Sequence, residues 1–87
     1  MKVAVWDTYV QRIDGKTMHF DILVPDNITD EKTIFGFGES YLNEKPIETK
    51  GITINQCTFC HIEKASEEIE NSIKRHGFHI IEMEHCN

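Results

Sequence analysis

Cysteine and histidine residues, whose side chains can bind metal ions, gather at the C-terminal end of this chain. The sequence contains three cysteines and five histidines. All but His19 lie within the last 31 residues: Cys57, Cys60, His61, His76, His79, His85 and Cys86. Thiolates and imidazoles are the usual ligands of tetrahedral zinc. We therefore expect a zinc-binding cluster of Cys57, Cys60, His61, His85 and Cys86, provided that the C-terminal tail folds back beside residues 57–61.

The motif CTFCH at residues 57–61 is also compatible with other chemistry. It matches the C-x-x-C-H pattern of haem attachment, but such attachment belongs to exported proteins, and MKVAVWDTYV does not resemble a signal peptide. A redox pair needs its first cysteine at a helix N-terminus, whereas the expected helix begins at Ser66, six residues beyond Cys60. Small buried cysteines or a thiol cluster without metal remain as alternatives to zinc.

Strand geometry restricts how Cys57 and Cys60 could act together. In a regular strand, side chains three residues apart point to opposite faces. A strand is expected at residues 52–62, so the two thiols can share a metal only if the chain turns around residues 55–58.

A hairpin near residue 14 decides which side chains meet across two predicted strands, at residues 2–10 and 17–24. The dipeptide Asp14-Gly15 between them indicates a type I′ turn with a two-residue loop. This loop sets a register that places Thr8 opposite Asp21, Tyr9 opposite Phe20 and Val10 opposite His19. The same register directs Asp7 toward Ile22 and the apolar stripe of Met18, Phe20, Ile22 and Val24.

A second candidate site follows from this register. His19 and Asp21 point the same way along one strand, opposite Thr8, and Trp6 lies beside them. A His–Asp pair in such a setting could bind a small ligand or act as an acid–base pair. The alternative is that Trp6, Thr8, His19 and Asp21 form the polar side of a half-covered hairpin.

The remaining pattern predicts the elements that must position these residues. A helix is expected from about Thr29 or Asp30, another at residues 66–77, and a last strand at residues 78–84. The order β-β-α-β-α-β predicts an α+β fold, a two-layer sandwich with one sheet of about four strands and two helices. We expect both helices on one face of the sheet. The other face, with Trp6, Val10 and Leu23, would be open to a ligand or to a second copy in a homodimer.

The length and the net charge of the chain restrict the kinds of function it could have. The 87 residues form a single domain, 1–87, with a net charge of −6 and no basic run, which argues against nucleic acid and anionic membranes as partners. Neither a signal peptide nor a membrane span is expected, so the predicted compartment is the cytoplasm. That compartment disfavours a disulfide.

Several segments together resemble a known family. VWDTYV, the Asp-Gly hairpin, MHFD, CTFCHIEKAS and IEMEHCN, which span essentially the whole chain, are similar to a family of small bacterial proteins known only as a domain of unknown function. The resemblance implies a compact α+β domain in a bacterial cytoplasm, and supplies no activity, substrate or catalytic residue. It suggests that the family's pattern includes His19, Asp21, Cys57, Cys60, His61 and Cys86.

The sequence is therefore compatible with three alternative functions. The first is a binding or accessory protein whose Cys/His cluster could bind zinc. The second is a small enzyme or thiol-redox protein that uses His19 and Asp21, or the cysteines. The third is a structural module that dimerises through its open sheet face.

Overall fold

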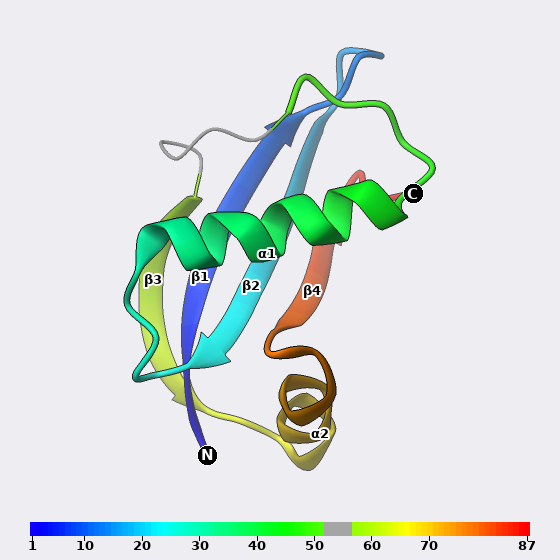
Figure 1. Cartoon of the computed structure of the whole chain (residues 1–87). Helices are drawn as coiled ribbons and strands as arrows, with labels where there is room; N and C mark the ends of the chain where they lie inside the picture. The colour runs from blue at the N-terminus through cyan, green and yellow to red at the C-terminus, as the bar shows by residue number, and fades with distance from the viewer. Residues whose placement is uncertain (52–56) are drawn as a thin grey trace.

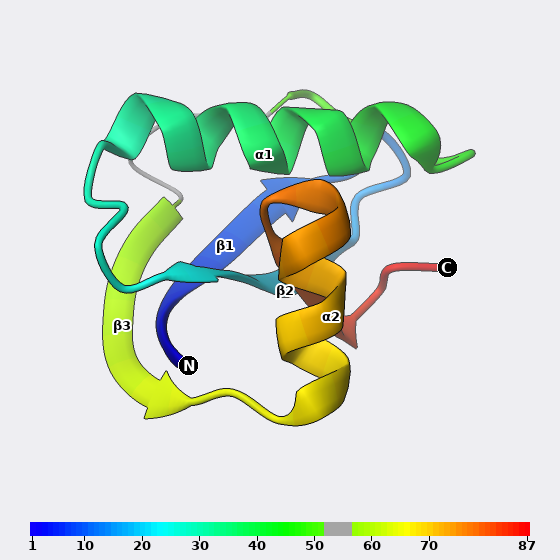
Figure 2. The same ribbon diagram turned by 60° about the horizontal axis from the view of Figure 1, so that its bottom comes forward.

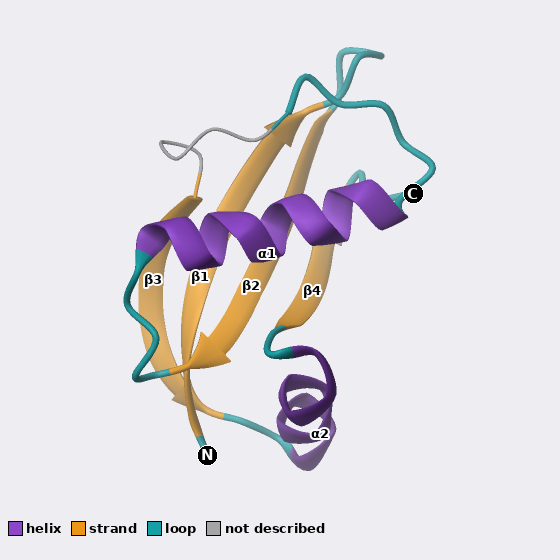
Figure 3. Ribbon diagram, in the orientation of Figure 1, coloured by secondary structure: helices purple, strands orange, loops and turns teal. Residues whose placement is uncertain are grey.

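The computed structural model describes residues 1–51 and 57–87, which form one antiparallel sheet and two helices (Figure 3). Along the chain the elements are β1 (Lys2–Gln11), β2 (Thr17–Pro25), α1 (Glu31–Glu44), β3 (Cys57–Lys64), α2 (Glu67–His76) and β4 (His79–Glu84). The strand order in the sheet is β3-β1-β2-β4 (Figure 1). The predicted α+β fold and its β-β-α-β-α-β order are confirmed.

Local sequence signals place the helix ends where they were predicted. The Asp30 carboxylate caps α1 by accepting a hydrogen bond from the Lys32 N–H at 3.3 Å. The Ser66 hydroxyl caps α2 in the same way, from the Ile69 N–H at 3.3 Å. Gly77 ends α2 with a φ of 87°, a left-handed conformation that glycine adopts at little cost.

The strand predicted at residues 52–62 is confirmed only in part. Residues 52–56, which include the first half of the expected turn at 55–58, lie outside the described residues. β3 begins at Cys57 and runs two residues further than predicted, to Lys64.

The hairpin between β1 and β2 differs from the predicted type I′ turn. The Gly15 N–H donates to the Arg12 carbonyl at 3.2 Å, and the Arg12 N–H donates to the Lys16 carbonyl at 2.8 Å. The loop therefore has three residues, a type I turn followed by Gly15 at a φ of 93°. The extra loop residue moves the strand register by one position. Thr8 lies opposite Phe20, Tyr9 opposite His19, Val10 opposite Met18, and Asp7 opposite Asp21.

This change of register reverses the predicted assignment of faces. Because side chains alternate along a strand, a shift of one residue moves a whole stripe to the other side. The stripe of Met18, Phe20, Ile22 and Val24 faces the same way as Ala4, Trp6 and Val10, and Ile34 of α1 completes this larger core. The predicted open face is wrong, since Trp6 and Val10 are buried on the α1 side.

The expectation of both helices on one face is wrong for α2, because its Ile73 packs on the face of the sheet opposite α1. The C-terminal end of α2 nevertheless reaches α1, where Gly77 lies next to the Phe37 ring. α1 crosses the sheet over the larger core, whereas α2 lies at one end of the sheet, near the start of β4 (Figures 1 and 2). Through Ile73, α2 covers a smaller cluster formed by Val3, Val5 and Leu23. These residues lie at the start of β1 and the end of β2. The other half of this face carries polar residues.

We call this polar half the open face, and define it as Asp7, Tyr9, His19 and Asp21 with their β3 neighbours Cys60, His61 and Glu63. The side chains of His61 and Glu63 are 50% and 42% exposed, and Tyr9 and Cys60 are exposed. Within residues 1–51 and 57–87, no helix has the length and apolar character needed to cross a membrane.

Candidate metal centre on the open face

Three potential metal ligands converge on the open face from the two central strands. Asp7 of β1 lies directly opposite Asp21 of β2, and His19 precedes Asp21 by two residues on the same side of β2. The His19 Nε2 atom is 3.7 Å from one Asp21 oxygen and 3.9 Å from one Asp7 oxygen. The three ligand atoms all lie within 4.8 Å of one another.

Two of these atoms lack the hydrogen bonds that shielded polar atoms normally make. His19 Nε2 and Asp21 Oδ1 are both inaccessible to solvent, and neither has a hydrogen-bond partner among the described residues. The 3.7 Å between them is too long for a hydrogen bond. In a tetrahedral zinc site with bonds of about 2.0–2.2 Å, neighbouring ligand atoms are about 3.3–3.6 Å apart. The two distances from His19 exceed this spacing by a few tenths of an ångström, and the two carboxylate oxygens lie within 4.8 Å of each other.

The electrostatics of the group favour a cation. The pKa of Asp21 is raised to about 6, first by burial and then by the Asp7 carboxylate beside it. The positive charges of His19 and His61 act in the opposite direction. Two carboxyl groups this close cannot both ionise cheaply unless a positive charge sits between them, as a bound metal ion would.

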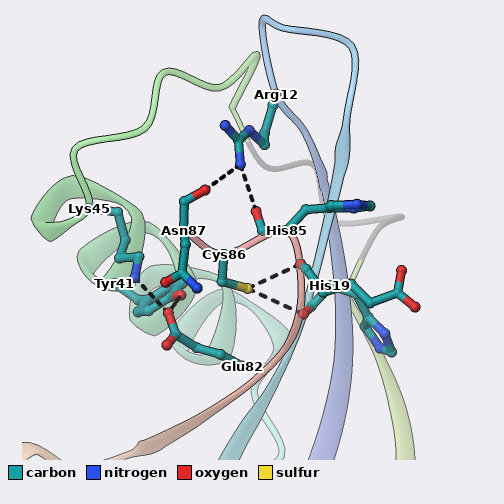
Figure 4. Close-up of polar contacts among 9 residues, drawn as sticks. Arg12, His19, Tyr41, Lys45, Glu82, His85, Cys86 and Asn87 are labelled. Atoms are coloured by element: carbon teal, nitrogen blue, oxygen red, sulfur yellow. Dashed lines mark hydrogen bonds and ion pairs between the residues drawn. The ribbon is translucent and has the colours of Figure 1, made fainter.

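His19 is held in place from both sides. The Tyr9 ring lies opposite it on β1 and stacks on the imidazole, with ring centroids 4.2 Å apart and an angle of 10° between the planes. The Cys86 thiol donates to the His19 carbonyl at 3.4 Å and to the Glu84 carbonyl at 3.3 Å (Figure 4). The Tyr9 stacking restricts the orientation of the imidazole, and the Cys86 contact holds the backbone of His19.

Two of the three cysteines, Cys57 and Cys86, are buried in the larger core, and the third, Cys60, is exposed. Cys57 is buried on the α1 side, where its sulfur accepts a hydrogen bond from Thr8 at 3.4 Å and burial raises its thiol pKa. Cys60 is exposed and belongs to the open face. Cys86 is buried just beyond β4, at the edge of the sheet opposite β3. Cys57 begins β3 and Cys86 follows β4, and these two strands form opposite edges of the sheet, with β1 and β2 between them. The structure does not bring the predicted thiol cluster together.

The two histidines expected in that cluster are also separated. His61 lies on the open face, with its Nδ1 3.2 Å from the Cys60 sulfur and its Nε2 3.1 Å from a Glu63 oxygen. His85 is in the tail, and its Nδ1 lies 2.9 Å from the Thr17 carbonyl.

The tail itself is fastened by side chains from elsewhere in the fold (Figure 4). Arg12 donates to the carbonyls of His85 and Asn87 at 3.1 and 2.8 Å. Beside the tail, Glu82 accepts hydrogen bonds from Lys45, at 2.7 Å, and from the Tyr41 hydroxyl. The pKa of Glu82 is lowered, first by Lys45 and then by Tyr41. Arg12 thus holds the backbone of the tail, and the contacts of Glu82 hold β4 against the end of α1.

The second predicted site is half retained. His19 and Asp21 share the open face, but Trp6 and Thr8 are buried on the α1 side and do not join them. Asp7 takes their place, and the sequence-based register missed it by turning it inward. A sequence signal against that register was available, because it places a carboxylate among apolar side chains, which is costly without a partner.

Comparisons with known proteins agree with the sequence resemblance. Residues 1–83 match the family described as Domain of unknown function (DUF2024). The NMR structure of protein NE1680 from Nitrosomonas europaea is similar over the full length of both chains, with 38% sequence identity and a TM-score of 0.79. No curated protein matches the sequence. The chain therefore belongs to the family described as a domain of unknown function (DUF2024), as its motifs indicated.

Proposed function

We propose that this chain is a small metal-binding protein whose site consists of Asp7, His19 and Asp21. The observation that carries the proposal is the pair of shielded, unpartnered atoms, His19 Nε2 and Asp21 Oδ1, with Asp7 beside them. A divalent cation would satisfy both atoms and compensate the two carboxylates in one step. Zinc was the metal expected from the sequence, and this proposal moves its site from the cysteine cluster to the centre of the sheet.

The location of the ligands supports stable binding. All three come from β1 and β2, whose nine-residue ladder fixes their spacing. Sites built on strands are held more precisely than sites on loops. The ligands approach from one side, which leaves the opposite side of the ion toward solvent for a further ligand.

Metal binding is better supported than substrate turnover. One cavity, of about 800 Å³, is lined by Met1, Lys2, Ile62, Glu63 and Lys64. A second, of about 360 Å³, is lined by residues of α1, α2 and the start of β4. Neither is lined by Asp7, His19 or Asp21. A ligand site on an open sheet fits storage, delivery or structural use of an ion better than catalysis in an enclosed pocket.

Isothermal titration of the metal-free chain with Zn²⁺, Co²⁺ and Mn²⁺ at neutral pH tests the proposal. We expect one ion per chain for at least one of these metals. Asp21→Asn and His19→Gln should each weaken binding by at least about tenfold, since each removes a direct ligand. Saturation at a hundred times Kd should raise the free energy of unfolding by about 2.7 kcal/mol, seen as a higher Tm.

Asp26→Asn is the matched control, because Asp26 is exposed in the turn after β2, outside the site. This variant should bind metal like the unmodified chain. Circular dichroism confirms that each variant is folded. Absence of one-to-one binding, or equal weakening by Asp26→Asn, would refute the site.

A further inference from the structure

An irregularity in β3 sits directly beside the proposed metal site. The pairing of β3 with β1 runs from Val3 opposite Glu63 to Val5 opposite His61, and then jumps to Trp6 opposite Phe59. Cys60 is thus the extra residue of a β-bulge, with no pairing partner on β1. Bulges occur next to functional sites because they redirect a side chain that regular pairing would point elsewhere.

The bulge changes where Cys60 can point. In regular pairing Cys60 and His61 would lie on opposite faces of the sheet. Here the His61 Nδ1 is 3.2 Å from the Cys60 sulfur, so these two consecutive side chains lie on the same side of β3. Cys60 therefore shares the open face with Asp7, His19 and Asp21, whereas Cys57, three residues earlier, is buried on the opposite face.

The donor set of the site is one ligand short of a tetrahedron. Asp7, His19 and Asp21 supply two oxygens and one nitrogen, a set that suits several divalent ions. A thiolate as the fourth donor would shift the preference toward zinc and similar thiophilic ions and away from magnesium and manganese. Among the described cysteines, Cys60 is the one on the open face.

We infer that the β3 bulge supplies Cys60 as the fourth ligand, so that the site selects a thiophilic divalent cation of the zinc class. This inference rests on the metal site proposed above. The Cys60 sulfur is not among the ligand atoms that lie within 4.8 Å of one another, so binding requires its exposed side chain to turn toward the three ligands. On binding, the S–H bond breaks, the sulfur electron pair forms the bond to the metal, and the proton leaves to solvent.

Cobalt titration of the metal-free chain distinguishes a thiolate ligand from oxygen and nitrogen ligands. A Co²⁺ ion bound to thiolate absorbs in the near ultraviolet through sulfur-to-metal charge transfer, and any tetrahedral Co²⁺ site also absorbs in the visible. We expect both absorptions from the unmodified chain. Cys60→Ser should keep the visible absorption, lose the near-ultraviolet band, and bind Zn²⁺ about ten- to a hundredfold more weakly. Its Mn²⁺ affinity should stay within about twofold, since manganese prefers oxygen and nitrogen ligands.

The other cysteine of the pair provides the matched control. Cys57→Ser makes the same chemical change on the opposite face and should keep the near-ultraviolet band. His61→Gln should keep it as well, because His61 contacts the sulfur rather than the ion. Cys60 is exposed, so its serine variant is expected to fold, and circular dichroism verifies this.

The outcomes separate the inference from the proposed function. Visible absorption without a near-ultraviolet band in the unmodified chain would overturn the role of Cys60 and leave the Asp–His–Asp site standing. A near-ultraviolet band that survives in Cys60→Ser but disappears in Cys57→Ser would also overturn it. If the unmodified chain shows no cobalt binding, the proposed function fails, and the inference fails with it.

Discussion

At the scale of single residues, Asp21 is the most informative position in the chain. Its side chain is 13% exposed, it lies opposite another carboxylate, and the pKa of its own carboxyl group is raised to about 6. Carboxyl groups with a strongly perturbed pKa cluster at functional sites. The effect of the ionised Asp21 carboxylate on the free energy of unfolding can be measured in metal-free protein.

Replacing Asp21 by Asn should change how stability depends on pH. The pKa of Asp21 is about 6 in the folded chain against 3.8 as the ordinary value, so the folded state holds more protons between about pH 4 and pH 6. The free energy of unfolding therefore falls through this window as pH rises. An asparagine does not titrate, so we expect Asp21→Asn to be more stable than the unmodified chain at neutral pH, by about 1 kcal/mol after solvent screening.

Urea unfolding of chelator-treated protein at about pH 4 and pH 7 measures this effect. Other carboxylates contribute a slope of opposite sign, since the pKa of Glu82 and that of Glu70 are lowered. The difference between variant and unmodified chain isolates Asp21. Asp26→Asn should show no such difference, and a loss of stability in Asp21→Asn at neutral pH would contradict the prediction.

At the scale of elements, the β1–β2 hairpin decides which residues form the site. Its three-residue loop ends in Gly15 in the left-handed region, and this one extra residue brings Asp7 opposite Asp21. The bulge in β3 leaves Cys60 without a pairing partner on β1, on the same face of the sheet. Two local irregularities thus assemble residues that regular strands with a two-residue turn would separate.

Gly15→Ala tests the turn directly. A Cβ at Gly15 would meet nothing within 4 Å, so the substitution adds conformational strain and no collision. At a φ of 93°, we expect a loss of about 1–2 kcal/mol in the free energy of unfolding. Chemical denaturation of the metal-free protein is the measurement.

Gly36→Ala is the matched comparison for this substitution. Gly36 lies within α1, is exposed and also has open space around it. Because alanine favours a helix interior over glycine, this variant should gain up to about 1 kcal/mol. Equal effects of the two glycine substitutions would count against the left-handed turn.

At the scale of the whole molecule, stability depends on a small core divided by the sheet. α1 covers the larger part through Ile34, which is fully buried. α2 covers the smaller part through Ile73. The open face receives neither helix, so the candidate ligands lie where the sheet buries less apolar surface, in a domain whose total stability is of order 5–15 kcal/mol.

Ile34→Ala should destabilise the whole domain rather than α1 alone. The cavity left beneath α1 is expected to cost about 2–5 kcal/mol, and Ile34→Val about 0.5–1.5 kcal/mol. Thermal unfolding followed by circular dichroism should show a single transition at lower temperature for both variants, in that order. A separate early transition for α1 would show that the helix is not part of the cooperative core.

Much of the architecture was determined by local sequence. The caps at Asp30 and Ser66, the stop at Gly77 and the alternating strands led to the correct element order, because these signals act within a few residues of the chain. His19 and Asp21 were recognised as a pair for the same reason, since residues two apart in a strand share a face.

Only the tertiary structure decided which side chains share a face of the sheet. A one-residue difference in the length of the hairpin loop shifts the register between the two strands that the loop connects. The tertiary structure moved Asp7 to the site, buried Trp6 and Thr8, and separated Cys57 from Cys60 and Cys86. Cysteines that are neighbours in sequence lie on opposite faces of a sheet, while Asp7 and Asp21, fourteen positions apart, are direct cross-strand neighbours. Sequence determined which residues could do chemistry in this protein, and strand register determined which of them meet.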